Sequence, residues 1–442
     1  MLLIAGQVVG QDRRPAVDRP SSSEKGSLLI FPNVEIKWDD TGRLVQDTFI
    51  NIANDYPERV YTQMYFVNGD GPLDAVLDPK TSKIIEPEHP GWNSVRFNMI
   101  LTPEQPAYCS ALTGLPACTR AFSDLDPMGR PDPEGPVGGR VLRGYALVWA
   151  INEQGEEIHW NHLAGDAVVV NYQTGSTWQY TADAFRALAG SHGLATDNNP
   201  SQLLLNGVEY EACYDTLRWT FFSSGPQDPS LLGMNLLMDT DLTLTPVGVD
   251  LRATNFGPIT TELTFDVWNE NEVRFVGTRR RITCWDQMLL SRYMDPNYFS
   301  RTHLQTDLAL ARVDGKANTD CEQFAIPAAL LGVANKLLRF PDVACGFASS
   351  GMSLVGEGCE EASVIYDAQP VTLTSSQPGD CDFNNTVNLR DLASFVGCMA
   401  GPEGGLLHPT CQCADLNQDG QVDEIDYGLF QNVFGAGPVS GQ

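Results

Sequence analysis

The residues best suited to chemistry lie in two acidic segments near the C-terminus, DCDFNNTVNLRD (380–391) and DLNQDGQVDEID (415–426). At an offset of 415 − 380 = 35 residues, acidic or amide side chains fall at matching positions of both segments. A twelve-residue calcium loop supplies side-chain oxygens from positions 1, 3, 5, 9 and 12 and a backbone carbonyl from position 7. The spacing therefore predicts a calcium loop that occurs twice.

Each loop offers a full set of oxygen ligands. In the first loop these come from Asp380, Asp382, Asn384, Asn388 and Asp391, with the carbonyl of Thr386. In the second loop they come from Asp415, Asn417, Asp419, Asp423 and Asp426, with the carbonyl of Gln421. The alternative is a pair of Asx-rich turns on an acidic surface, but the repetition in register favours two bound Ca²⁺ ions.

The segments that follow the loops extend the repeat. Each loop is followed by a short amphipathic segment, LASFVGCM or YGLFQNVF, in which Phe395 and Phe430 are in register. Position 12 is Asp391 in one loop and Asp426 in the other, where the common EF-hand has a bidentate Glu. This duplicated unit, over residues 379 to about 436, resembles the dockerin module of secreted polysaccharide-degrading assemblies. The resemblance implies a small α-helical, calcium-binding domain at 380–436 that docks onto a cohesin-like protein partner.

Two features distinguish this segment within that family. Dockerins that bind cohesins usually carry small hydroxyl residues at loop positions 10 and 11, where this chain has Leu389 with Arg390 and Glu424 with Ile425. The insert GPEGGLLHPTCQC between the repeats resembles the cysteine-bearing insert in dockerin-like tails of planctomycete-type bacterial proteins. The resemblance thus implies docking through a surface of altered composition.

Composition limits the partners and the compartment. With 56 acidic and 28 basic residues, the net charge of −28 disfavours nucleic acid and anionic membranes as partners. No apolar run approaches 18 residues, so we expect no membrane span. Eleven cysteines without a CxxC pair favour disulfides over zinc. Plausible local pairs are Cys109 with Cys118, Cys345 with Cys359, and Cys398 with Cys411 or Cys413.

The body of the chain reads as strands. Short runs rich in Val, Ile, Phe and Tyr, separated by Gly, Pro, Asn and Asp, predict antiparallel sandwiches. Segments 54–68 and 255–269 resemble each other, VRF recurs at 95–97 and 273–275, and LAGDAVVV (163–170) resembles LLGVANKLL (330–338). We therefore expect a mainly β protein with two tandem immunoglobulin-like sandwiches, although chance similarity between strands is the alternative.

The expected boundaries follow from these patterns. Residues 1–27 are interpreted as a signal-peptide remnant with a disordered N-terminus, which indicates a secreted or cell-surface protein. Sandwiches are expected at 28–180 and 237–367, separated by a connecting segment at 181–236. That segment contains one predicted helix, TADAFRALAG, from Thr181 to Gly190. A Pro, Ser and Thr-rich linker at 368–379 precedes the calcium module at 380–436.

Candidates for catalysis are numerous but unspecific. Carboxylate pairs that could serve glycoside hydrolysis are Asp39 with Asp40, Glu156 with Glu157, and Asp239 with Asp241. His159 and His162 could share a metal only on a helix, and the surrounding pattern favours a hairpin. The sequence therefore predicts no catalytic residues and a secreted, non-catalytic, calcium-binding β-sandwich protein with a docking tail. The alternative is a glycoside hydrolase or a carbohydrate-binding protein that carries a dockerin module.

Overall fold

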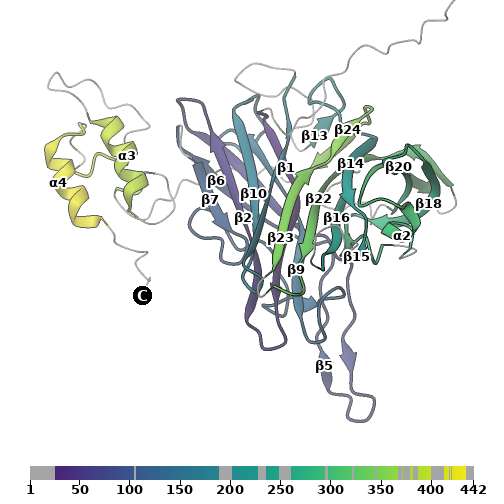
Figure 1. Cartoon of the computed structure of the whole chain (residues 1–442). Coiled ribbons are helices and arrows are strands. Elements are labelled where there is room, and N and C mark those ends of the chain that lie inside the picture. Colours follow the sequence, from purple (N-terminus) through teal and green to yellow (C-terminus); the bar gives the residue numbers. More distant parts are fainter. Residues whose placement is uncertain are drawn as a thin grey trace, which may run out of the picture.

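The computed structural model describes residues 25–103, 106–188, 202–226, 235–247, 260–293, 297–320, 323–343, 346–366, 371, 379–381, 387–399, 413–417, 419 and 421–434. The described chain is mainly β, and all its sheets are antiparallel (Figure 1). Residues 1–24 of the expected signal-peptide remnant and disordered N-terminus lie outside the described residues, as does most of the linker. Gly26 and Ser27, which were expected in that segment, instead donate backbone hydrogen bonds to Leu163 and Phe185 of the body. The helices are α2 (Arg301–Leu304), α3 (Leu389–Cys398) and α4 (Glu424–Val433).

The first half of the body forms one ten-stranded sheet with the order β11-β10-β2-β1-β9-β3-β6, while β7, β8 and β12 pair with β2, β9 and β1. Its main strands are β1 (Leu28–Trp38), β2 (Leu44–Asn54), β3 (Val60–Asn68), β6 (Ser94–Leu101), β7 (Pro106–Ser110), β9 (Arg140–Ile151), β10 (Leu163–Asn171) and β11 (Ser176–Thr181). The short strands are β4 (Val76–Leu77), β5 (Ile84–Glu86), β8 (Arg130–Pro131) and β12 (Asp183–Phe185).

The second half forms a six-stranded and a five-stranded sheet. Its main strands are β14 (Thr216–Phe222), β16 (Leu237–Val247), β17 (Thr260–Trp268), β18 (Arg274–Thr283), β19 (Asp286–Leu289), β20 (Leu308–Asp320), β22 (Ala329–Arg339) and β23 (Phe347–Ser353). The short strands are β13 (Gln202–Leu205), β15 (Gly225–Pro226), β21 (Gln323–Pro327), β24 (Val355–Glu357) and β25 (Ala362–Ile365). Strands β13 and β25 pair with each other.

The two halves repeat the same strand pairing. The order β1-β9-β3-β6 in the first half corresponds to β14-β20-β17-β18 in the second. Likewise, β7-β2-β10-β11 corresponds to β19-β16-β22-β23. Three matches seen in the sequence fall on equivalent strands, namely β3 with β17, β6 with β18, and β10 with β22. The sequence repeat therefore has a structural counterpart, a duplicated set of β-sheets.

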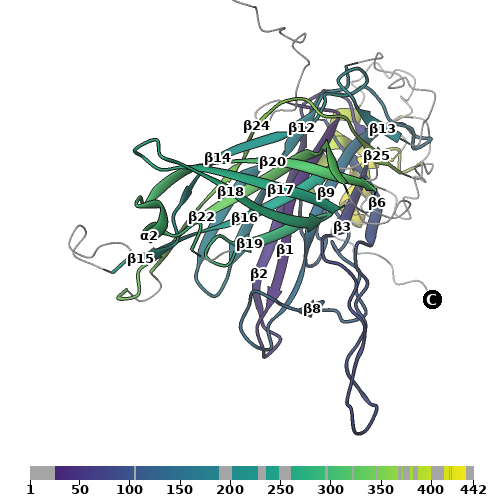
Figure 2. The same ribbon diagram turned by 90° about the vertical axis from the view of Figure 1, so that its right-hand side faces the viewer.

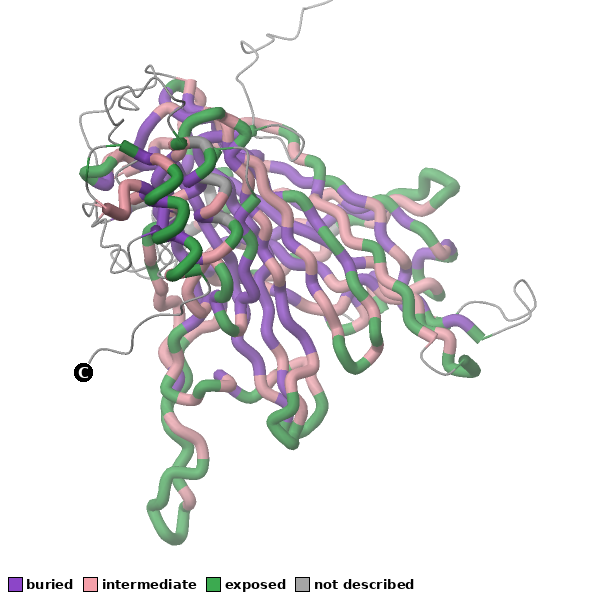
Figure 3. The backbone as a smooth tube through the Cα atoms, turned by 90° about the vertical axis from the view of Figure 1, so that its left-hand side faces the viewer, coloured by how far each residue is buried: buried purple, intermediate pink, exposed green. Residues whose placement is uncertain are grey.

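Strand β1 lies between two hydrophobic cores, which links the halves. Leu29 and Phe31 belong to the core of the first half, whereas Leu28 and Ile30 belong to a core shared with the second half. Alternate residues of a strand point to opposite faces. Because both faces of β1 are covered at residues 28–31, this run does not alternate between apolar and polar residues. Purple strands inside the body mark this burial (Figure 3). Residues of both expected sandwiches thus contribute to one core.

The predicted helix from Thr181 to Gly190 is wrong over its described part, 181–188. Asp183–Phe185 form β12, which pairs with β1 in the register Leu28 to Phe185 and Ile30 to Asp183. Ala184 and Phe185 are both buried in this arrangement. Pairing and burial against β1 outweigh a helix propensity that is a weak prior. Gly190 lies outside the described residues.

A long hairpin carrying β4 and β5 projects from the body (Figure 2). At its base, the Arg143 guanidinium lies 3.0 Å from the carboxylate of Asp70. The imidazole of His89 lies between the carboxylates of Glu86 and Asp124, at 2.7 and 2.9 Å. These buried or half-buried polar contacts fix the hairpin's root, while the hairpin itself is largely exposed (Figure 3).

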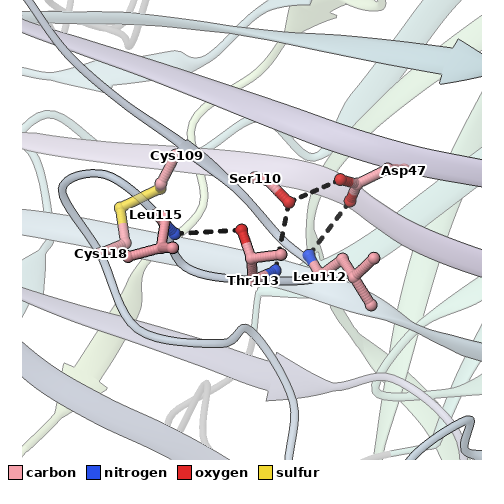
Figure 4. Close-up of a disulfide and its surroundings, with 7 residues drawn as sticks. All are labelled: Asp47, Cys109, Ser110, Leu112, Thr113, Leu115 and Cys118. Atoms are coloured by element: carbon pink, nitrogen blue, oxygen red, sulfur yellow. Dashed lines mark hydrogen bonds between the residues drawn. A yellow bond between two sulfur atoms is a disulfide. The ribbon is translucent and has the colours of Figure 1, made fainter.

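One disulfide lies in the body and another in the C-terminal tail. The predicted Cys109–Cys118 bond is confirmed, and it closes the loop after β7 (Figure 4). Of the two partners predicted for Cys398, Cys411 or Cys413, the second is excluded, because Cys413 bonds Cys381 across the starts of the two acidic loops. Cys398 is disulfide-bonded as well. Cys345 and Cys411 lie outside the described residues, so the other predicted pairs remain predictions.

The tail helices α3 and α4 lie side by side and pack on each other (Figure 1). The rings of Phe395 and Phe430 lie 5.0 Å apart, and Val387 and Val422 are fully buried in the same small core. Within the expected linker, the backbone N–H of Val371 donates to the carbonyl of Glu153 on the body. None of the helices in the described part of the chain has the length and apolar character needed to cross a bilayer.

Candidate metal centre in the tail

The second acidic loop brings three carboxylates together. Oxygens of Asp415, Asp419 and Asp426 lie within 4.8 Å of one another. These are positions 1, 5 and 12 of the loop, which are separated by up to eleven residues in sequence. Hard oxygen ligands at this spacing suit a divalent cation. The three residues could therefore hold a metal ion.

Backbone hydrogen bonds to loop side chains fix the turn. The N–H of Asp419 donates to Asn417 Oδ1 at 2.9 Å and to Asp415 Oδ1 at 3.1 Å. The N–H of Gln421 donates to Asp419 Oδ1 at 2.9 Å. Such Asx turns hold the chain in a tight curve. They place the side chains of positions 1, 3 and 5 along its inner side.

Asp426 connects the loop to the helix that follows. Its Oδ1 accepts from the N–H of Asn417 and its Oδ2 from the N–H of Asp423, both at 3.0 Å. Asp423 in turn accepts from the N–H of Ile425 at 2.7 Å, which completes a capping box at the start of α4. This reciprocal capping satisfies donors that a helix N-terminus otherwise leaves unpaired. The last loop ligand is thus held by the helix it begins.

The first loop repeats the part of this geometry that is described. Asp391 Oδ2 accepts from the N–H of Asn388 at 2.8 Å, the counterpart of the bond from Asp423 to Asp426. Asp391 Oδ1 accepts from the N–H of Cys381 at 2.7 Å. Asp380 and Asp391 are both fully buried. The other predicted ligands of this loop, Asp382, Asn384 and Thr386, lie outside the described residues.

The charge balance of the tail favours a cation. Residues 380–436 contain nine Asp or Glu side chains and a single Arg, Arg390. Asp391 and Asp426 are fully buried, and both carboxylates accept hydrogen bonds from backbone N–H groups. A buried carboxylate is costly unless it is paired, hydrogen-bonded or bound to a metal. The backbone N–H groups supply part of this compensation, and a bound cation would add to it.

Members of the candidate carboxylate pairs hydrogen-bond to other residues in the structure. Asp39 caps a turn through Thr41 and Arg43, and Glu156 accepts from Asn152. Glu157 instead points into the body, where it accepts a hydrogen bond from the hydroxyl of Tyr366. Asp39 and Glu156 thus hold local turns, whereas Glu157 makes a long-range contact with Tyr366.

The remaining candidates have separate partners too. Asp239 accepts from the hydroxyl of Ser291, and Asp241 accepts from the amide of Gln287. The ring of His162 pairs with Asp55 at 3.0 Å, while the ring of His159 meets the amide of Asn161 at 3.0 Å. The two rings thus hydrogen-bond to different residues.

Sequence reasoning missed a buried polar cluster between the two halves. The amide nitrogen of Gln287 lies 3.3 Å from Glu35 Oε2 and 2.9 Å from Asp241 Oδ2. The ammonium of Lys37 lies 2.7 Å from Glu35 Oε1. Burial and then the charge of Glu35 hold the pKa of the Asp241 carboxyl well above its usual range. Glu35 and Gln287 are 252 residues apart, so no local pattern could have linked them.

Comparisons with known proteins give no family. No protein-family model and no curated protein matches the chain. A crystal structure of Thermotoga maritima 1070 is 9% identical and covers 34% of this chain and 99% of its own, with a TM-score of 0.21. The CupB6 tip adhesin from Pseudomonas aeruginosa is 10% identical and covers 76% of this chain and 93% of its own, with a TM-score of 0.12. A chain of the cryo-EM structure of broad bean stain virus is 8% identical. The match covers 81% of this chain and 97% of that chain, with a TM-score of 0.13. Likenesses this low show neither fold nor function.

Proposed function

We propose that the tail binds two Ca²⁺ ions, one in each acidic loop, and that the ions stabilise its fold. The observation that carries the proposal is the convergence of Asp415, Asp419 and Asp426 within 4.8 Å in the loop where the spacing predicts positions 1, 5 and 12. Asn417, Asp423 and the carbonyl of Gln421 would complete the second site. By the 35-residue repeat, Asp380, Asp382, Asn384, Thr386, Asn388 and Asp391 would hold the first ion.

We further propose that the calcium-loaded tail docks the protein onto an extracellular or cell-surface protein partner. Leu389 and Ile425, at loop positions 10 and 11, are 71% and 61% exposed. Exposed apolar side chains at the start of both helices give the tail a surface for protein contact. The body is proposed to be a secreted, non-catalytic pair of immunoglobulin-like sandwiches. The proposal rests on the dockerin-like repeat and on these exposed positions.

Calcium dependence is tested by thermal unfolding of the full chain with Ca²⁺ and with excess EGTA. All eight tryptophans lie between Trp38 and Trp285, so tryptophan fluorescence reports on the body alone. Helical circular dichroism reports on the tail, which holds the two ten-residue helices α3 and α4. At free Ca²⁺ a thousandfold above Kd, each ion contributes about 4 kcal/mol of stability. We expect EGTA to lower the melting temperature of the helical signal and to leave the fluorescence transition in place.

Matched variants separate ligand loss from a general effect of charge. The double change Asp380→Ala with Asp415→Ala should reproduce the effect of EGTA. Glu424→Gln, which removes a charge at position 10 outside the ligand set, should unfold like the parent. An unchanged helical transition on chelation would remove the calcium proposal.

Docking is tested by gel filtration of the calcium-loaded chain with a cohesin domain. We expect a calcium-dependent complex that is lost in Leu389→Asp with Ile425→Asp, while the helical signal of this double variant stays intact. If no complex forms, cohesins are excluded as the partner. A reducing-sugar assay on polysaccharides should show no turnover, and turnover would favour the glycoside hydrolase alternative.

A further inference from the structure

A polar groove lies on the first half of the body, across strands β2, β10 and β11. It has a volume of about 340 Å³ and is lined by both polar and small side chains. Small-molecule sites in proteins occupy about 300 to 1,000 Å³ and carry a few placed polar groups. The lining residues are Lys25, Asn51, Ile52, Ala53, Ala164, Gly165, Asp166, Gln179, Thr181 and Ala182. The groove therefore lies at the lower end of that size range, and its polar residues could orient a ligand.

Three adjacent strands present a row of polar side chains to the groove. Asp166 on β10 pairs in register with Asn51 on β2 and with Thr181 on β11. In the neighbouring row, Ala164 pairs with Ala53. Two alanines beside a polar row leave room for a ligand to approach the hydrogen-bonding atoms. Because sheet strands are more rigid than loops, these atoms are held at fixed positions.

Hydrogen bonds within the row determine which groups remain for a ligand. Asp166 Oδ2 accepts from the amide nitrogen of Asn51 at 2.9 Å and from that of Gln179 at 3.0 Å. Both amides are thereby oriented, and each uses one N–H on Asp166 and keeps a second N–H as a donor. The amide oxygens of Asn51 and Gln179, together with Asp166 Oδ1, then remain as acceptors. The groove thus offers three acceptor oxygens and the second N–H of each amide, which suits hydroxyl groups because a hydroxyl both donates and accepts.

The charges of the groove disfavour an anion. Asp166 carries a negative charge in the middle of the row, and the ammonium of Lys25 is already ion-paired with Asp55. A ligand carboxylate or phosphate would meet both the charge of Asp166 and the acceptor oxygens. Neighbouring hydroxyl groups, in contrast, can each donate to one of these oxygens. Neutral sugars carry such hydroxyls on adjacent carbons.

The second half of the body supports the outer wall. Ser353 Oγ donates to the carbonyl of Thr181 at 2.8 Å, and Ser349 Oγ donates to the carbonyl of Thr177 at 3.0 Å. Both serines lie on β23, so this strand holds β11 in place along its length. Packing between the halves therefore maintains the groove.

We propose that this groove binds a neutral sugar unit of an oligosaccharide or polysaccharide. Hydroxyl groups of the sugar donate to Asp166 and to the amide oxygens of Asn51 and Gln179. The assignment does not depend on calcium binding or docking by the tail.

Isothermal titration calorimetry of the full calcium-loaded chain tests the proposal with cellohexaose, xylohexaose, mannohexaose and hexagalacturonic acid. We expect saturable binding of at least one neutral hexasaccharide in preference to the acid. Asp166→Asn and Gln179→Ala should each weaken this binding by about tenfold or more, since each removes or misorients an acceptor. Gln179 is exposed, so its replacement leaves the fold intact.

Two controls complete the experiment. Gln173→Ala, in the exposed turn between β10 and β11, should bind as the parent does. The tail variant Asp415→Ala should also bind normally, so that failure of the calcium proposal is not mistaken for failure of this one. The proposal is overturned if none of the neutral hexasaccharides binds, if the acid binds best, or if Asp166→Asn and Gln179→Ala both bind like the parent.

Discussion

The buried carboxyl of Asp183 makes the stability of the body depend on pH. Asp183 lies on β12, is 3% exposed, and its Oδ2 has no hydrogen-bond partner in the described part of the chain. Burial raises the pKa of this carboxyl from 3.8 to about 8. Near pH 7 the folded protein therefore holds a proton that the unfolded chain has released. The change Asp183→Asn replaces the acid by a neutral side chain of the same shape.

The sign and size of the effect follow from the raised pKa. Between pH 4 and pH 8 the folded state binds one more proton than the unfolded state, so the free energy of unfolding falls as pH rises. The slope is about 1.4 kcal/mol per pH unit and levels off above the folded pKa. From pH 5 to pH 7 the parent should thus lose about 3 kcal/mol that the Asp183→Asn variant retains. The variant should gain stability relative to the parent as pH increases.

Urea unfolding at several pH values, followed by tryptophan fluorescence, measures this difference. Trp149 and Trp219 lie in the same core cluster as Phe185, which is close to Asp183 on β12. Asp74→Asn, an exposed change on the projecting hairpin, is the matched control and should show no such trend. A difference between variant and parent that stays constant from pH 5 to pH 8 would refute the reasoning, as would a variant that is less stable at pH 8.

Three further changes test the packing. Replacing both Cys109 and Cys118 by Ser removes a disulfide between residues nine positions apart. The change should lower the free energy of unfolding of the body by about 2.5 kcal/mol in urea, and an unchanged urea midpoint would contradict this. Asp47→Ala removes the acceptor for Ser110 Oγ and for the N–H of Leu112, at 2.6 and 3.1 Å (Figure 4), and should cost about 1 to 3 kcal/mol by the same measurement. Phe430→Ala leaves a cavity in the tail core and should destabilise the helical transition by about 3 to 5 kcal/mol. An altered fluorescence transition in this last variant would show that the tail and the body unfold together.

Local patterns were sufficient where the structure is local. Strand runs, the Cys109–Cys118 bond and the amphipathic segments that became α3 and α4 all depend on residues close in sequence. The acidic spacing also placed Asp415, Asp419 and Asp426 near one another, because a tight twelve-residue loop leaves little freedom. Weak repeats were informative as well, since their order matches the duplicated strand pairing.

The remaining features depend on contacts between distant segments. The sequence at Asp183–Phe185 favours a helix, and only its pairing with β1 makes it a strand. The core shared by the two halves requires both faces of β1 to be covered. The prediction of two separate sandwiches did not include this contact. The groove at Asp166 depends on three strands in register, of which β2 and β10 contribute Asn51 and Asp166, 115 residues apart. Such arrangements become visible only in three dimensions.

The number of calcium ions bound per chain tests the central claim most directly. Calorimetric titration of Ca²⁺ into the metal-free full chain should give two ions for the parent, because each acidic loop carries its own ligand set. Asp415→Ala should bind one ion, and Glu424→Gln should bind two. The assignment of the two acidic loops as calcium sites would be contradicted if the parent bound no Ca²⁺. It would also be contradicted if Asp415→Ala bound as many ions as the parent.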